Sequence, residues 1–228
     1  MKSVRPFLFL LTVICLSPAL SGQQEQDDAE VAAMMEKSIT VHAEVVSQTY
    51  CKSDDGIFLV DMNLRLRFVN VSSTAVILSR KVESSPIVRA ARSEDSASHG
   101  DFLYAPDVHP LLSKPAPDAP SFGMAPSPKL FVILAPRQSF ETLARTSVIA
   151  ATDAVEANGK NGLLPKGSYV LQVGIHTWPY DWPDFAAKIN TRKLRMRWAK
   201  YGELATGLVY SDFAPFTIPG RFEGPSFH

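Results

Sequence analysis

Apolar and polar residues alternate along several short stretches of the chain, which is the pattern of β-strands with one buried face. The clearest stretch is 58–68, where every even position is apolar and most odd positions are polar or charged. Shorter runs predict further strands over 39–46, 75–81, 130–134, 140–149, 168–177, 204–211 and 213–218. Two strand fragments are expected at 87–90 and 102–104.

Turn residues add two expectations about how these strands are arranged. The polar turn at 70–74 predicts that the strand over 75–81 pairs antiparallel with the strand over 58–68. Pro215 predicts a bulge or bend within the closing strand, since proline cannot donate to a strand ladder.

Many short alternating strands predict an all-β domain over residues 39–219, built as an antiparallel β-sandwich. Two stretches interrupt the strand pattern. Residues 84–128 hold eight of the 17 prolines and predict a long irregular insertion. Residues 183–201 follow the pattern of a helix, because Pro183 and Asp184 suit a first turn and Gly202 a stop. We expect the inner side of this helical insertion, before the last strand, to carry Phe185, Ile189, Met196 and Trp198.

The two ends of the chain differ from the domain between them. Lys2 and Arg5 precede an apolar run over 7–16, and small residues follow, which predicts a secretory signal peptide over 1–22. The run is far shorter than the roughly 20 residues that cross a bilayer, so no transmembrane segment is expected. Residues 23–38 form an acidic, flexible leader and 220–228 a C-terminal tail. The protein is therefore predicted to be exported, to the periplasm or the extracellular space.

Cysteine and charge narrow the class of protein further. Cleavage after residue 22 would leave Cys51 as the single cysteine, so no internal disulfide can form and an apolar core must supply the stability. Lysine and arginine together number 23 and so do aspartate and glutamate, giving a formal net charge of zero. Without a global positive field, nucleic acid is not an expected partner.

The run LPKGSYVLQV at 164–173 resembles the segment that precedes the penultimate strand of immunoglobulin-like and fibronectin type III-like sandwiches. In those domains a tyrosine closes a corner by hydrogen-bonding its hydroxyl to nearby backbone. The resemblance implies this role for Tyr169, with Gly167 in the turn before it. Paired cysteines around a tryptophan are absent, and the architecture hosts many functions, so the resemblance implies a fold rather than an activity.

The stretch HTWPYDWPDF at 176–185 is the main candidate binding surface, because flat aromatic rings commonly contact sugars, peptides and proteins. Its candidate binding residues are His176, Trp178, Tyr180 and Trp182, although the rings could instead cover the core. His176 with Asp181 or Asp184 could support acid–base chemistry. Surface polar groups are the simpler interpretation, and no catalytic residue is assigned.

Other polar clusters are weighed in the same way. A loop near residue 100 carries four residues that could hold a divalent cation: His99, Asp101, Asp107 and His109. Solvated polar residues on a loop are the simpler interpretation, so no metal is predicted. The basic stretch 188–200, with Arg192 and Arg195 as candidate binding residues, could receive an acidic partner, lipid headgroups or a polyanion such as a surface polysaccharide. A solvated helix face is the simpler interpretation. In a eukaryote, Asn70 would be a glycosylation acceptor on an exposed turn.

The short sequence motifs that identify common enzyme classes are absent, which makes catalysis less expected but does not exclude it. The sequence therefore predicts a secreted, non-catalytic binding protein without a cofactor, whose partner is a protein, a peptide, a glycan or another cell-envelope component. Two alternatives stay open. One is a carbohydrate-active or hydrolytic protein that uses residues 176–185, and the other is a proteinase inhibitor that uses the Pro-rich loop.

Overall fold

The computed structural model describes residues 38–52, 57–80, 86–105, 123–151, 163–177 and 191–219. Strands dominate this part of the chain and the two helices are short, so the fold is all-β, as predicted. The elements are β1 (Ile39–Lys52), β2 (Ile57–Asn70), β3 (Val76–Ser79), β4 (Ile87–Ala91), α2 (Glu94–Ser98), β5 (Phe131–Leu134), β6 (Ser139–Ala151), β7 (Gly167–His176), α4 (Thr191–Trp198), β8 (Glu203–Leu204) and β9 (Leu208–Ile218).

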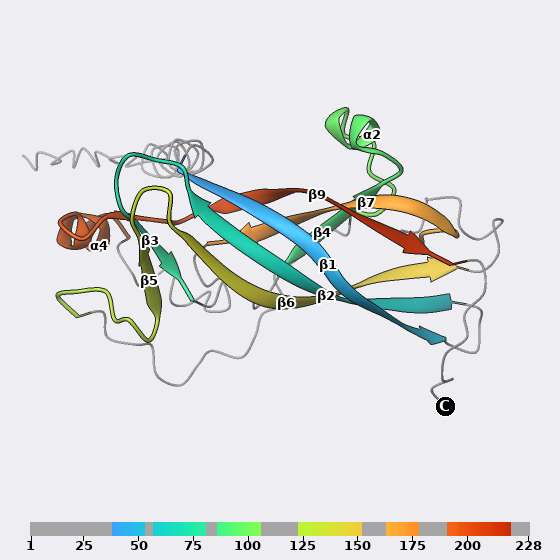
Figure 1. The fold of residues 1–228 in the computed structure, drawn as a ribbon, viewed down its shortest axis with the longest axis horizontal. Coiled ribbons are helices and arrows are strands. Elements are labelled where there is room, and N and C mark those ends of the chain that lie inside the picture. Colours follow the sequence, from blue (N-terminus) through green and yellow to red (C-terminus); the bar gives the residue numbers. More distant parts are fainter. Residues whose placement is uncertain are drawn as a thin grey trace, which may run out of the picture.

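The strands form a six-stranded sheet in the order β4-β7-β9-β1-β2-β6 and a three-stranded sheet in the order β5-β3-β8 (Figure 1). β2 lies near one edge of the large sheet, between β1 and β6, and pairs antiparallel with both. The even positions from Phe58 to Asn70 are all buried, as the alternation predicts. One apolar face thus runs the length of the longest strands.

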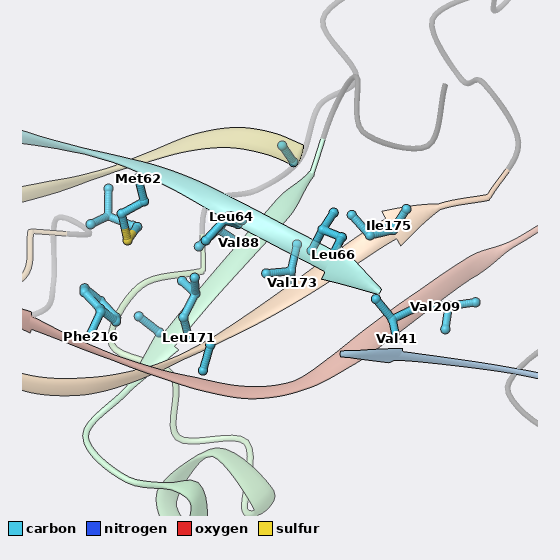
Figure 2. Close-up of a cluster of buried hydrophobic side chains, with 14 of the residues drawn as sticks. Val41, Met62, Leu64, Leu66, Val88, Leu171, Val173, Ile175, Val209 and Phe216 are labelled. Atoms are coloured by element: carbon cyan, nitrogen blue, oxygen red, sulfur yellow. The ribbon is translucent and has the colours of Figure 1, made fainter. Parts of the chain in front are cut away.

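The large sheet curls so that its two halves, β4-β7-β9 and β1-β2-β6, enclose one apolar core. Met62, Leu64 and Leu66 of β2 belong to the same buried cluster as Val88, Leu171, Val173, Ile175, Val209 and Phe216 of β4, β7 and β9 (Figure 2). Figure 2 shows β2 crossing over these strands with its side chains directed at theirs. The alternating residues of β7 predicted to share one face, from Tyr169 to Ile175, are all buried here.

The predicted pairing of β3 with β2 is wrong. β3 pairs antiparallel with β5 and parallel with β8, and it forms the centre of the small sheet. All four of its residues are buried, so it has no solvent face to match the outer face of β2. After the turn at 71–75 the chain leaves the large sheet, because β2 is already hydrogen-bonded to β1 on one side and to β6 on the other.

α4 covers the small sheet, and its buried side matches the prediction at Trp198 but not at Met196. Leu194 and Trp198, four residues apart, pack with Ile77, Phe131 and Leu204, whereas Met196 is exposed. Met196 therefore does not lie on the inner side. The helix ends at Trp198, and Gly202 follows with φ of 147°, where a Cβ would come within 2.6 Å of the Ala75 carbonyl oxygen. Glycine lets the chain enter β8 close beside that backbone.

Asn70 is buried, which contradicts the expectation that its turn exposes it. Its Nδ2 donates to the carbonyl oxygens of Thr74 and Leu134, both at 2.8 Å. Its Oδ1 accepts from the backbone N–H and the hydroxyl of Ser72, at 2.9 and 2.8 Å. The side chain that would carry a glycan is fully engaged inside the folded domain, where it ties the turn to β5.

The two halves of the large sheet meet where β1 lies parallel to β9, with Val41 opposite Ser211. The predicted bulge near Pro215 is misplaced, because Pro215 pairs regularly with Val170. The ladder between β7 and β9 shifts register instead between Gln172 and Gly174, which leaves an extra β9 residue near Ser211. β9 is one continuous strand, whereas the start of the predicted closing strand, at residue 204, belongs to β8.

Several predicted segments lie outside the described residues: the signal peptide, most of the leader, much of the Pro-rich insertion, the first part of the helical insertion and the C-terminal tail. Within the described part of the chain, neither helix has the length and apolar character required to cross a membrane.

Candidate functional site

The outer faces of the two sheet halves differ in chemistry. On β1, β2 and β6 the outward residues form ion pairs, with Arg65 2.8 Å from Glu44 and Arg145 2.6 Å from Asp61. The carboxyl of Asp61 also accepts a hydrogen bond from Ser147, and this bond, with Arg145, lowers the pKa of Asp61. The pair of Arg65 and Glu44 is exposed on both sides, and such pairs contribute little energy and are typical of a solvated surface.

The outer face of β4, β7 and β9 is aromatic instead. Gln172 and Gly174 of β7 point outward, because their neighbours Leu171, Val173 and Ile175 fill the core. Beside them lie residues of β4 and β9 that are half-buried: Ile87, Arg89, Tyr210 and Phe213. We call these six residues, together with Phe102, the Arg89 face.

Arg89 is the centre of this face. Its guanidinium lies over the ring of Tyr210, 3.8 Å from the centroid, and over the ring of Phe102, 4.5 Å from the centroid. Its Nη2 donates to Oε1 of Gln172 at 2.8 Å, while its buried Nε has no hydrogen-bond partner among the described residues. Stacking of this kind holds the planar guanidinium in one orientation.

The local sequence positions both rings. The loop after β4 folds back on it, because Leu103 donates to the carbonyl of Ala90 at 2.9 Å and Ala90 donates to that of Tyr104 at 2.8 Å. Phe102 is thereby brought against Arg89. On the other side, a Cβ at Gly174 would come within 2.8 Å of the Tyr210 ring. Only glycine in β7 lets Arg89 reach across the strand to Tyr210.

α2 lies within the same folded-back loop and was not predicted. Ser93 caps it by accepting a hydrogen bond from the backbone N–H of Ser96 at 3.1 Å. The cap and the short helix reverse the chain between β4 and Phe102, so they contribute to the site indirectly.

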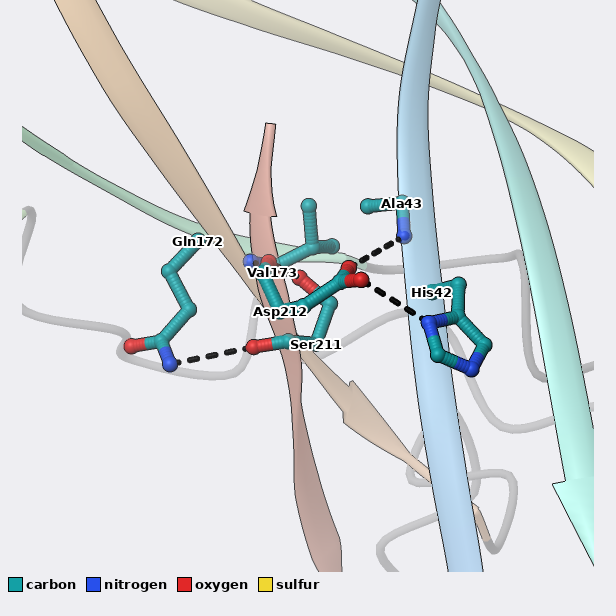
Figure 3. Close-up of polar contacts among 6 residues, drawn as sticks. All are labelled: His42, Ala43, Gln172, Val173, Ser211 and Asp212. Atoms are coloured by element: carbon teal, nitrogen blue, oxygen red, sulfur yellow. Dashed lines mark hydrogen bonds and ion pairs between the residues drawn. The ribbon is translucent and has the colours of Figure 1, made fainter. Parts of the chain in front are cut away.

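A second polar group lies where β1 meets β9 (Figure 3). Nδ1 of His42 lies 2.8 Å from Oδ2 of Asp212, and Oδ1 of Asp212 accepts from the Ala43 N–H at 2.9 Å. Ser211, on the bulge, points to the other side, where its hydroxyl accepts from the Val173 N–H at 3.0 Å. Histidine, aspartate and serine thus lie close together, but the hydroxyl is directed away from the imidazole. The group ties the two sheet halves together.

Among the predicted binding residues, His176 ends β7 and is half-buried. Burial lowers its pKa below the ordinary value of 6.5. Trp178, Tyr180 and Trp182 lie outside the described residues, as do the carboxylates at 181 and 184 considered with His176, so the aromatic stretch is not tested.

The basic and metal candidates have other surroundings. Arg195 donates a hydrogen bond to the hydroxyl of Thr206, which attaches α4 to the segment before β9, and the side chain of Arg192 lies outside the described residues. His99 contacts the carbonyl oxygen of Asp95 in α2 at 2.8 Å. Asp101 is exposed, and Asp107 and His109 are not described. The described residues contain no group of three or more potential metal ligands.

Tyr169 lies in the core rather than at a binding surface. Its hydroxyl donates to the carbonyl oxygen of Pro165, which is a backbone contact of the kind that the resemblance implies. Its ring stacks on Phe216 at 5.4 Å and lies under the guanidinium of Arg92, beside Gly167. Burial raises the pKa of Tyr169.

Comparison with known proteins identifies no relative: no family model matches the chain, and no curated protein or solved structure is significantly similar to it.

Replacing His176 with Gln is expected to flatten the pH dependence of stability. Because burial lowers the folded-state pKa, the unfolded chain binds the proton first as the pH falls below about 6.5, and the native protein loses stability down to the folded-state pKa. Urea unfolding at pH 7.5 and 5.5 measures this loss. The variant should lose less stability than the native protein over this interval. Equal losses would contradict a buried, neutral His176.

Proposed function

We propose that the protein is an exported, non-catalytic β-sandwich protein of immunoglobulin-like type that binds a protein partner through the Arg89 face. The observation that carries this proposal is the contrast between the two outer faces of the sheet. One face is covered by exposed ion pairs, and the other concentrates half-buried tyrosine, phenylalanine and arginine side chains.

The residue types of the Arg89 face support a protein as the partner. Tyrosine, phenylalanine and arginine are enriched in protein interfaces, where a few of them contribute most of the binding energy. The rings are held in place by Arg89 and by the close approach of Tyr210 to Gly174, so little side-chain entropy would be lost on binding. A rigid aromatic surface with one fixed cation suits recognition.

The other parts of the proposal rest on separate support. Export rests on the sequence of residues 1–22. The immunoglobulin-like architecture is supported by the curled sheet with an enclosed core and by the hydrogen bond from Tyr169 to Pro165. The non-catalytic part of the proposal rests on the sequence, in which the motifs of the common enzyme classes do not occur.

Site-specific photocrosslinking tests the proposal. A photoreactive phenylalanine analogue at Phe213 should form a defined adduct with one protein when the chain is expressed and exported by the organism that makes it. The same analogue at Arg67, on the ion-paired face, is the matched control. Adducts from position 67 alone, or the same adducts from both positions, would contradict binding through the Arg89 face.

A further inference from the structure

β6 is an edge strand with an open side. It pairs with β2 from Ser139 to Ala151 without a register shift, and it is the last strand of the six-stranded sheet. On its other side it makes one isolated bridge, from Ala150 to Leu164. Among the described residues, no strand pairs with the outer side of β6 between the turn at 135–138 and this bridge, so this stretch can accept another strand.

The bridge also shows which backbone groups face outward. The carbonyl of Ile149 accepts from the Leu164 N–H at 2.9 Å, and the N–H of Ala151 donates to the Leu164 carbonyl at 3.1 Å. Backbone groups of a strand alternate between its two sides, so those of Glu141, Leu143, Arg145 and Ser147 face the same open side. Within the described chain, no hydrogen bond reaches the backbone groups of these four residues on that side.

Proteins usually protect such an edge, and the opposite edge of this sheet is protected. β4 is short, and the returning loop bonds to Ala90 along its free side. Between 139 and 149 β6 contains no proline, no lysine and no bulge, and its two charged residues, Glu141 and Arg145, are of opposite sign. An edge of this length without proline, lysine or bulge favours pairing with another strand.

We propose that two copies of the chain pair through β6, antiparallel, about a two-fold axis at Leu143. In this register Glu141 of each copy lies opposite Arg145 of the other, which places opposite charges directly across from each other on both sides of the axis. Leu143, with 64% of its surface exposed, meets its own counterpart on the axis. A two-fold contact requires such self-complementary residues.

The register also fits the length of β6 that lies between the turn at 135–138 and the bridge to Leu164. Ser139 of one copy lies opposite Ser147 of the other, and the next outward position, Ile149, is the one already bonded to Leu164. An axis at Arg145 would instead place two arginines opposite each other. An axis at Ala144 would place Leu143 opposite Arg145. The axis at Leu143 is therefore the register that matches the charges.

Sedimentation analysis of the purified protein over a range of concentrations tests the pairing. We expect a species of twice the mass of one chain. Leu143→Pro should raise the dimer dissociation constant by about tenfold or more, because proline removes the central outward N–H without removing a bond to β2. Glu141→Lys should also weaken the dimer, because the introduced lysine would face Arg145 of the second copy. Glu44→Lys, on the same outer face but away from the edge, is the matched control and should leave the dimer intact.

Disulfide trapping provides a second measurement that does not depend on the stability of a variant. Hydrogen-bonded residues of an antiparallel pair have Cα atoms about 5.5 Å apart, within the range that a disulfide spans. In a chain with Cys15 and Cys51 changed to Ser, Leu143→Cys should form a disulfide-linked dimer with the oxidant diamide, which accepts the two electrons and two protons. Val71→Cys, on an exposed turn, should not. A monomer at every concentration, or equal trapping at both positions, would overturn the proposal.

Discussion

Replacing Asn70 with Ala is expected to lower the free energy of unfolding by about 2–4 kcal/mol. Its side chain is fully buried and makes four hydrogen bonds. Alanine leaves the buried carbonyl of Leu134 without this donor, and it releases the turn that carries the chain from β2 to β3. The loss exceeds that of an ordinary hydrogen bond because a buried polar group without a partner carries its full desolvation cost.

Urea unfolding of the Asn70 variants measures this loss against two comparisons. Asn63→Ala removes an exposed asparagine that bonds to Ser47 at 2.9 Å, and it should change stability by about 0.5 kcal/mol or less. Asn70→Asp keeps the shape but replaces the two donors with an oxygen facing two carbonyls, so it should destabilise at least as much as Asn70→Ala. Similar stabilities for the Asn63 and Asn70 alanine variants would contradict a structural role for Asn70.

Replacing Trp198 with Ala is expected to cost about 3–5 kcal/mol of unfolding free energy, the range for truncating a large buried aromatic side chain. The ring is 1% exposed and packs edge-on against Phe131 at 5.0 Å. Its Nε1 donates to the carbonyl of Gly123 at 3.2 Å. Since Trp198 is the largest member of the cluster between α4 and the small sheet, its loss should release both elements.

Hydrogen exchange locates this effect, and Met196→Ala is its matched control on the same helix. The Trp198 variant should lose protection first at α4 and at β3, β5 and β8, while β2 and β7 keep theirs. Met196 is 65% exposed, so its truncation should change stability by about 0.5 kcal/mol or less. A larger loss for Met196→Ala than for Trp198→Ala would contradict the packing of α4 through Trp198.

The sequence predicted strand positions and faces better than strand partners. Alternation along β2 and β7 identifies the buried residues correctly, because side chains of a strand alternate between its faces whatever its neighbours are. Pairing depends on residues distant in the chain, so the local turn at 70–74 wrongly indicated β2 as the partner of β3. The same limit applies to α4, where apolar residues occur on more than one side and the small sheet determines which side is buried.

The candidate site was harder to predict for a related reason. His176 was recognised from its place beside the aromatic stretch, but Arg89, Phe102 and Tyr210 were not singled out. Their relationship arises from three separate segments and from a glycine in the strand between them. The available signal was a single arginine within the otherwise apolar run IVRAA at 87–91, which alternation would place on an outer face. Nothing local indicated which rings would stack on it.

The parallel contact between β1 and β9 also has a consequence for the order of folding. The first described strand bonds to the last, and His42 and Asp212 are 170 residues apart in sequence. The curled sheet cannot close until the ribosome has synthesised the final strand, and contacts of such long range form slowly. A growing chain of this protein therefore stays incompletely folded. Passage through a narrow export channel, which the proposed signal peptide implies, requires a chain in that state.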